Sequence, residues 1–233
     1  MCIRDRYIEL FSESSDIYRA IQKCVLNRSG YLYDEPHFLL QQEVSEVGSY
    51  FSIIKAIAAG NHKLSAIAAV LEAKSTNLTK YLKTLMDLDI LERRVPVTEE
   101  NPEKSKRGLY KIKDNYLRFW FAFIYPNMSF IESGHSGIVM DKIRKGLTTS
   151  HIGFVYEDIC QERMWELNVN NAWPFQFSKL GGYWDAKNEI DIAALDPEGK
   201  NLILGECKYW KEPVGLNAVS YTHLRAHETR SNL

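Results

Sequence analysis

The stretch between Glu189 and Lys208 constrains the fold and the chemistry of this chain more than any other. It contains two short runs rich in Ile, Leu and Ala, residues 190–195 and 202–204, on either side of an Asp-Pro-Glu-Gly turn at residues 196–199. Apolar runs of this length around a turn that contains Pro and Gly predict a β-hairpin.

The expected hairpin carries three charged side chains. Successive side chains on a strand point to opposite faces, so Glu206 and Lys208 should project together while Cys207 takes the other face. Asp191, on the partner strand, should lie at the same end of the sheet. Two converging carboxylates would hold a hard cation such as Mg²⁺, and the ammonium would position an attacking water, which suits phosphodiester hydrolysis. The competing interpretation is a solvated charged face on an edge hairpin, which deters aggregation.

Asp191 followed one hairpin later by Glu206-Cys207-Lys208 resembles the signature of the restriction-endonuclease-like superfamily, PD-(D/E)XK. Three further segments occur in a matching order, at residues 31–40, 101–106 and 116–121. Together they resemble the C-terminal half of a family of archaeal and bacterial P-loop ATPases, in which an ATPase core precedes a winged helix and a nuclease-like domain of unknown function. The resemblance covers residues 7–217.

This resemblance implies roles for individual residues. Asp191 and Glu206 would bind Mg²⁺ together with the carbonyl oxygen of Cys207, and Lys208 would orient the attacking water. Glu157 would reach the same site from the first helix of the domain. Helical periodicity instead places Glu157 opposite an apolar face at Ile152, Val155 and Ile159 and predicts that it is exposed, so both interpretations stay open.

The superfamily core continues beyond the third strand, whereas few family-like residues follow Lys208. The chain is therefore expected to be inactive by itself, even if a longer parent is a nuclease. The competing class is a non-catalytic module that binds DNA or protein and regulates the ATPase.

The predicted fold class is α+β, a winged helix-turn-helix followed by a truncated α/β restriction-endonuclease-like domain. The expected boundaries are 7–49 for a remnant of ATPase lid helices, 50–113 for the winged helix, 114–150 for an aromatic helix and linker, and 151–217 for the partial nuclease-like domain. Residues 1–6 and 219–233 resemble translated sequencing-adapter sequence, and a natural polar tail is the alternative. No Gly-x-x-x-x-Gly-Lys-Ser/Thr loop occurs, so ATP would bind only in a missing N-terminal part.

The winged helix is predicted from three helical stripes followed by strands at 90–97 and 108–112. Ser75 or Thr76 is expected to cap the third helix. Its inward-facing residues should be Leu78, Tyr81, Leu82, Leu85 and Leu88. The candidate nucleic-acid contacts are the outward residues of that helix and the bases of the hairpin tip: Asn77, Lys80, Lys83, Lys104, Lys106 and Arg107. Because the tip also contains Glu99, Glu100 and Glu103, DNA contact and a protein-docking role are both retained.

Two further elements follow from aromatic residues. Asp114 is expected to cap an aromatic helix at 116–125, whose bulky side chains are too many for one face and should pack on both sides until Pro126 ends it. The alternation of Trp173, Phe175 and Phe177 predicts a first strand at 169–178.

Composition limits the partners. The chain has 29 Lys and Arg against 30 Asp and Glu, so any basic footprint for DNA must be local. Its 4 cysteines are scattered, which favours a reducing, cytoplasmic setting without a disulfide framework. No apolar run is long enough to cross a bilayer, so no membrane association is expected. The expected partners are DNA and the ATPase core of the parent.

Overall fold

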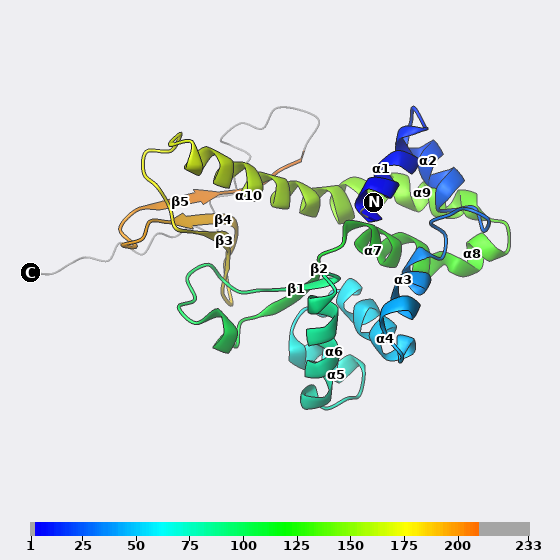
Figure 1. Ribbon diagram of the computed structural model, residues 1–233, viewed down its shortest axis with the longest axis horizontal. Coiled ribbons are helices and arrows are strands. Elements are labelled where there is room, and N and C mark those ends of the chain that lie inside the picture. The colour runs from blue at the N-terminus through cyan, green and yellow to red at the C-terminus, as the bar shows by residue number, and fades with distance from the viewer. Residues whose placement is uncertain (1–2, 210–233) are drawn as a thin grey trace, which may run out of the picture. The chain divides into compact units, whose positions relative to one another are not determined.

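The computed structural model describes residues 3–209, which form two compact units that are interleaved in the sequence (Figure 1). Unit 1 takes the chain up to Arg94 and again Leu109–His151, and unit 2 takes Val95–Gly108 and the chain from Ile152 onward. The mixture of helices with small antiparallel sheets confirms the α+β class. The expected domain end at 210–217 and the tail at 219–233 lie outside the described residues.

Unit 1 is mainly helical. Its α-helices and the strands of its one two-stranded sheet are α1 (Ile3–Ser12), α2 (Ile17–Cys24), α3 (Glu35–Glu43), α4 (Val47–Ala58), α5 (Leu64–Val70), α6 (Ser75–Asp87), β1 (Leu91–Arg94), β2 (Leu109–Ile112), α7 (Asn115–Phe119), α8 (Met128–Glu132) and α9 (Ser136–Leu147). A π-helical turn, η2 (Trp120–Ile124), and a 3-10 turn, η3 (Tyr125–Asn127), join α7 to α8, and a second π-helical turn, η4 (Thr148–Ile152), follows α9.

Helices α4, α5 and α6 precede the hairpin β1–β2 in the order that the sequence predicts. On α6, Leu78, Leu82 and Leu85 are buried, whereas the predicted outward residues Asn77, Lys80 and Lys83 are exposed. The predicted cap is wrong, because Lys74 occupies the N-cap position and makes no side-chain capping hydrogen bond. The antiparallel strands are also shorter than expected, since the chain leaves unit 1 after Arg94.

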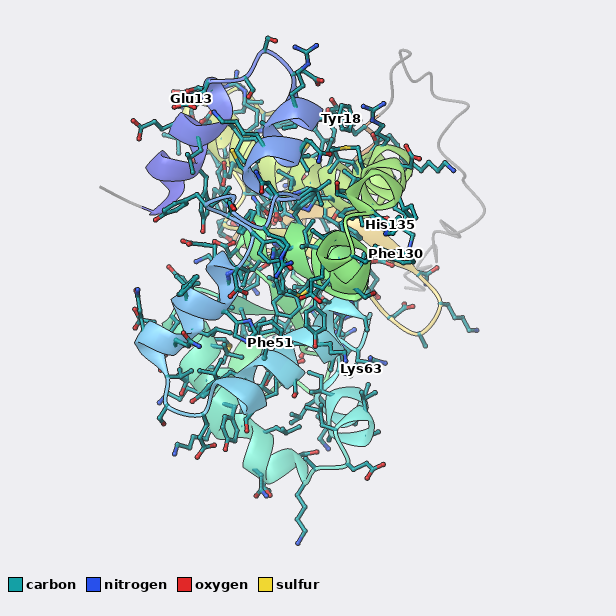
Figure 2. The ribbon with its side chains drawn as sticks, turned by 90° about the vertical axis from the view of Figure 1, so that its right-hand side faces the viewer. Glu13, Tyr18, Phe51, Lys63, Phe130 and His135 are labelled. Atoms are coloured by element: carbon teal, nitrogen blue, oxygen red, sulfur yellow. The ribbon has the colours of Figure 1, made fainter. Side chains whose placement is uncertain are left out.

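The predicted aromatic helix corresponds to α7 and η2, whose side chains are largely buried in the core of unit 1. Asp114 caps it as predicted, accepting a hydrogen bond from the backbone N–H of Leu117 at 2.7 Å. Its aromatic side chains are buried on several sides, and the fully buried Trp120 donates its indole N–H to the carbonyl of Tyr33 at 2.8 Å. Figure 2 shows Phe51 of α4 in this unit, with its ring centroid 4.7 Å from that of Phe121.

The chain does not end its helical course at Pro126, which lies within the 3-10 turn η3 and is followed directly by α8. The segment 129–150, predicted as a loop with a helical piece, is mostly helical, and α9 buries the side chains of Val139, Met140, Ile143 and Leu147. Phe130 and His135 mark α8 and the start of α9 in Figure 2.

Unit 2 contains a three-stranded antiparallel sheet covered by one long helix. The strands are β3 (Lys179–Trp184), β4 (Glu189–Leu195) and β5 (Leu202–Gly205), in the order β3-β4-β5. Helix α10 (Gly153–Val169) runs along one face of this sheet (Figure 1). The predicted hairpin is therefore present as β4–β5, and Gly199 takes a positive φ of 68° in its turn. Met164, Phe177, Ile192 and Ala194 form the buried core between helix and sheet.

The expected strand at 169–178 is wrong. Residue Val169 ends α10, and the chain then forms a loop before β3 begins at Lys179. Both side-chain ends of the buried Asn168 hold this loop: its amide donates to the carbonyl of Phe177 at 2.9 Å, and its oxygen accepts from the N–H of Phe177 at 3.0 Å. The alternating aromatics thus pack against the core from a loop and not from a strand ladder.

Residues 95–108, which we call the hairpin tip, extend from β1–β2 but belong to unit 2. They contain a short 3-10 turn, η1 (Pro102–Lys104). The backbone N–H of Val97 donates to the carbonyl of Gly182 at 2.9 Å, so the hairpin tip is attached to β3.

Candidate functional site

The three charged residues of the hairpin lie at one end of the three-stranded sheet. Ile192 of β4 pairs with Gly205, the last residue of β5, and Glu206, Cys207 and Lys208 continue beyond the end of that strand. Since Ile192 points into the core beneath α10, alternation along β4 places the side chain of Asp191 on the opposite face.

Direct contacts tie these residues together. The carboxylate of Asp191 accepts a hydrogen bond from the backbone N–H of Cys207 at 2.8 Å through Oδ2. The ammonium of Lys208 lies 2.9 Å from Oε2 of Glu206. As predicted, Glu206 and Lys208 project together, whereas Cys207 packs against the core on the other side.

The electrostatics show that the charges interact. Burial raises the pKa of Asp191 above its usual range; the Cys207 N–H opposes this shift, and the negative charge of Glu206 adds to it. The hydrogen bond to Glu206 raises the pKa of Lys208, with further contributions from the charges of Asp191 and Glu157. Lys208 is therefore held as an ammonium ion at neutral pH, among three carboxylates.

The charge of Glu157, on α10, acts on this site from the helix-covered side of the sheet. Glu157, Cys160 and Met164 are spaced for one helical face, and Met164 is buried in the core against the sheet. Ile159, which helical periodicity placed on the buried face, is 53% exposed instead, so the periodicity argument for a solvent-exposed Glu157 is wrong. Glu157 is partly buried, and its charge raises the pKa values of both Lys208 and Cys207.

The sequence pattern did not identify one residue beside the site, Cys160. Cys160 of α10 packs against the same core cluster as Cys207. Burial raises the pKa of the Cys207 thiol, and a hydrogen bond with Cys160 raises it further, so the Cys207 thiol stays neutral against the core. The spacing of Cys160 from Met164 on one helix is the signal that could have revealed it.

The donor set is small. Within residues 3–209, no three His, Cys, Asp or Glu side chains are grouped so that they could hold a metal ion. Asp191 and Glu206 offer two carboxylates, and the main chain of Cys207 lies beside both. Two carboxylates with a backbone carbonyl are oxygen ligands of the kind that Mg²⁺ accepts while it keeps several waters.

The predicted nucleic-acid contacts fall into separate groups. Asn77, Lys80 and Lys83 are exposed on α6 in unit 1. Lys104 and Lys106 are exposed on the hairpin tip in unit 2, but the guanidinium of Arg107 donates hydrogen bonds to Glu99 and to the carbonyl of Trp184.

Among the described residues, no helix has the length and apolar character that a membrane span requires.

Part of the chain is similar to known protein sequences. Residues 120–225 match DUF234, described as archaeal and bacterial proteins of unknown function. An uncharacterized protein of Methanocaldococcus jannaschii is 39% identical over 192 residues, which is 82% of this chain and 42% of that relative. The chain thus spans less than half the length of the curated relative that it matches. No solved structure matches.

The DUF234 match includes α10, the whole three-stranded sheet and the four predicted catalytic residues. It also includes the helical segment from Trp120 to His151 in unit 1.

Proposed function

We propose that Asp191, Glu206, Lys208 and Glu157 form the catalytic group of a metal-dependent, nuclease-type domain that acts on DNA within a longer protein. The observation that carries this proposal is the convergence of Asp191, Glu206 and Lys208 at one end of the sheet, where each affects the pKa of another. Charges beside apolar strands are costly unless they are paired, solvated or bound to a metal ion.

The residues fit a hard divalent cation such as Mg²⁺. Glu206 raises the pKa of Asp191 because two negative charges close together repel, and a bound cation would relieve this repulsion. Asp191, Glu206 and the carbonyl of Cys207 would hold the ion. When bound, it would supply a water of lowered pKa and polarise a phosphoryl oxygen.

Lys208 has a separate task. Its raised pKa keeps it protonated, so it acts as a positive charge and hydrogen-bond donor and not as a general base. It would hold the attacking water and stabilise the negative charge that develops on the phosphate. Glu157, on the helix side, would position Lys208 through its charge.

The surrounding protein is proposed to be a P-loop ATPase whose winged helix is formed by α4–α6 and β1–β2. In support, the helices and the hairpin occur in that order, and the M. jannaschii relative is long enough to include a further domain. ATP would bind in that further domain.

A non-catalytic module that binds DNA or protein is the second candidate. The specific observation in its favour is the ion pair between Lys208 and Glu206, which also suits a solvated edge of a sheet. Both candidates predict exposed charge at this edge, so the test must measure metal binding and cleavage separately.

Metal binding is measurable on this chain directly. Titration with Mn²⁺, followed by electron paramagnetic resonance, should show one site in the wild type that is lost in Asp191→Ala and weakened in Glu206→Gln. Glu198→Gln, an exposed carboxylate of the same hairpin that pairs with Lys200, is the matched control and should bind as the wild type does. Equal Mn²⁺ affinity in Asp191→Ala and wild type would refute the metal site.

Cleavage is tested in a longer homologous protein that carries the same residues. Plasmid, single-stranded DNA and RNA are incubated with Mg²⁺ or Mn²⁺, and the substitution equivalent to Asp191→Ala should abolish product. If the longer protein cuts none of these substrates, the non-catalytic module is the better description.

A further inference from the structure

The hairpin tip, residues 95–108, is held against the edge of β3 by contacts of two kinds. The N–H of Val97 donates to the carbonyl of Gly182 at 2.9 Å, as a neighbouring strand would. The side chain of Val97 also lies beside Gly181, where an added Cβ would be 3.6 Å from the Cβ of Val97, an ordinary van der Waals separation. The tip and β3 are thus close enough for their side chains to be in contact.

Arg107 forms the second contact. Its Nε donates to Oε1 of Glu99 at 2.7 Å, and its guanidinium also donates to the carbonyl of Trp184 at 3.3 Å. In return, the indole N–H of Trp184 donates to the carbonyl of Arg107 at 3.2 Å. The hydrogen bond raises the pKa of Arg107 and lowers that of Glu99, so both groups remain charged and paired.

This ion pair can be opened by a competing anion. Ion pairs near the surface contribute little to stability, with a median of about 0–1 kcal/mol. The Arg107 side chain is 41% exposed, and phosphate is a strong bidentate partner for a guanidinium. Lys104 and Lys106, on the same tip, are exposed and would attract the same anion.

We propose that the Glu99–Arg107–Trp184 contact is a latch, which keeps the hairpin tip on β3 and withholds Arg107 from nucleic-acid phosphates. When the latch opens, Lys104, Lys106 and Arg107 become one phosphate-binding strap. The inference concerns nucleic-acid binding by the tip and does not depend on metal binding or cleavage at Asp191.

The test opens the latch without removing a base. Glu99→Gln takes away the partner charge of Arg107, and Trp184→Phe removes the indole donor while it keeps an aromatic ring. Glu100→Gln is the matched control, because it removes the same charge from an exposed neighbour on the tip. All are made in the full 233-residue chain.

Two measurements are needed. Limited trypsin digestion, with mass spectrometry of the products, reports cleavage after Lys104, Lys106 and Arg107, which should be faster in Glu99→Gln and Trp184→Phe than in Glu100→Gln. Fluorescence anisotropy with a labelled DNA duplex reports affinity against salt. Release of Arg107 should steepen the slope of log K against log salt by about 0.9, the contribution of one phosphate contact.

The outcomes separate the two parts of the inference. Faster digestion with tighter DNA binding, lost again when Lys104→Ala and Lys106→Ala are added, supports the latch. Unchanged digestion overturns it. Faster digestion without a gain in affinity over Glu100→Gln also overturns it, because the tip would then be a docking element alone.

Discussion

The carboxylate of Asp191 is held by the backbone N–H of Cys207, the residue between Glu206 and Lys208, at 2.8 Å. This bond fixes the aspartate against the segment that carries the other two charges. An asparagine at the same position can accept the same bond through its amide oxygen. Asp191→Asn therefore removes the charge while it preserves the geometry.

We expect Asp191→Asn to stabilise the protein at pH 7 by on the order of 1 kcal/mol, the usual size of a single-substitution effect. Burial raises the pKa of Asp191, so its ionised form is disfavoured in the folded state. Stability contributed by this group is complete below the unfolded pKa of about 4 and is lost as pH rises through the folded pKa. The difference from wild type in urea unfolding should thus vanish near pH 3.

Asp185→Asn is the matched comparison for that experiment. Hydrogen bonds from the backbone N–H groups of Lys187 and Asn188 and from the Asn188 side chain hold the pKa of Asp185 at about 2. Its ionised form is therefore favoured by folding, and the substitution should destabilise at pH 7. The same sign for both variants would contradict the assigned environments.

Glu157→Gln should weaken Mn²⁺ binding by roughly tenfold, the low end of effects from residues beside metal ligands. The physical reason is the charge that Glu157 contributes from α10 to Lys208. Glu162→Gln, an exposed carboxylate on the same helix, should leave the affinity unchanged. Equal Mn²⁺ affinities of Glu157→Gln and Glu162→Gln would show that Glu157 does not contribute to the metal site.

His151 should make folding sensitive to mild acid. Burial and the positive charge of Arg118 lower its pKa to about 4, and its Nδ1 is buried without a hydrogen-bond partner among the described residues. The unfolded chain gains this proton near pH 6.5, so stability falls between about pH 6.5 and pH 4, by on the order of 2 kcal/mol.

His151→Gln should flatten that part of the pH profile, measured by urea unfolding in steps of half a pH unit. His135→Gln changes an exposed histidine and should keep the wild-type profile. A wild-type profile that is level from pH 6.5 to pH 4 would be inconsistent with the burial of His151.

Asn168→Ala should cost roughly 2–4 kcal/mol, because it leaves the buried N–H and carbonyl of Phe177 without partners. Asn170→Ala, at an exposed position two residues on, should change stability little. Equal midpoints of thermal unfolding for the two variants would show that the two hydrogen bonds between Asn168 and Phe177 do not stabilise the loop before β3.

The local sequence pattern predicted the structure correctly where the conformation depends on a single element. The hairpin of β4 and β5, the exposed face of α6 and the cap at Asp114 each follow from spacing within a few residues. The alternation around Cys207 also placed Glu206 and Lys208 together.

Periodicity failed where a distant contact decided the conformation. Trp173, Phe175 and Phe177 alternate as strand residues do, but the bonds from Asn168 hold them in a loop. On α10 both faces carry apolar side chains, so the pattern could not identify which face meets the sheet. The docking of the hairpin tip on Gly182 links segments far apart in the sequence, and no local signal marks it.

The interleaving of the two units has a consequence for synthesis on the ribosome. Residues 95–108 emerge long before β3, the strand that receives the hydrogen bond of Val97. Unit 1 can assemble its own hairpin early, yet its tip must wait for most of the chain. A shortened chain that ends at His151 would keep all of unit 1 and would also keep residues 95–108, without the strand to which they attach. Truncation at a single position therefore cannot separate the two units.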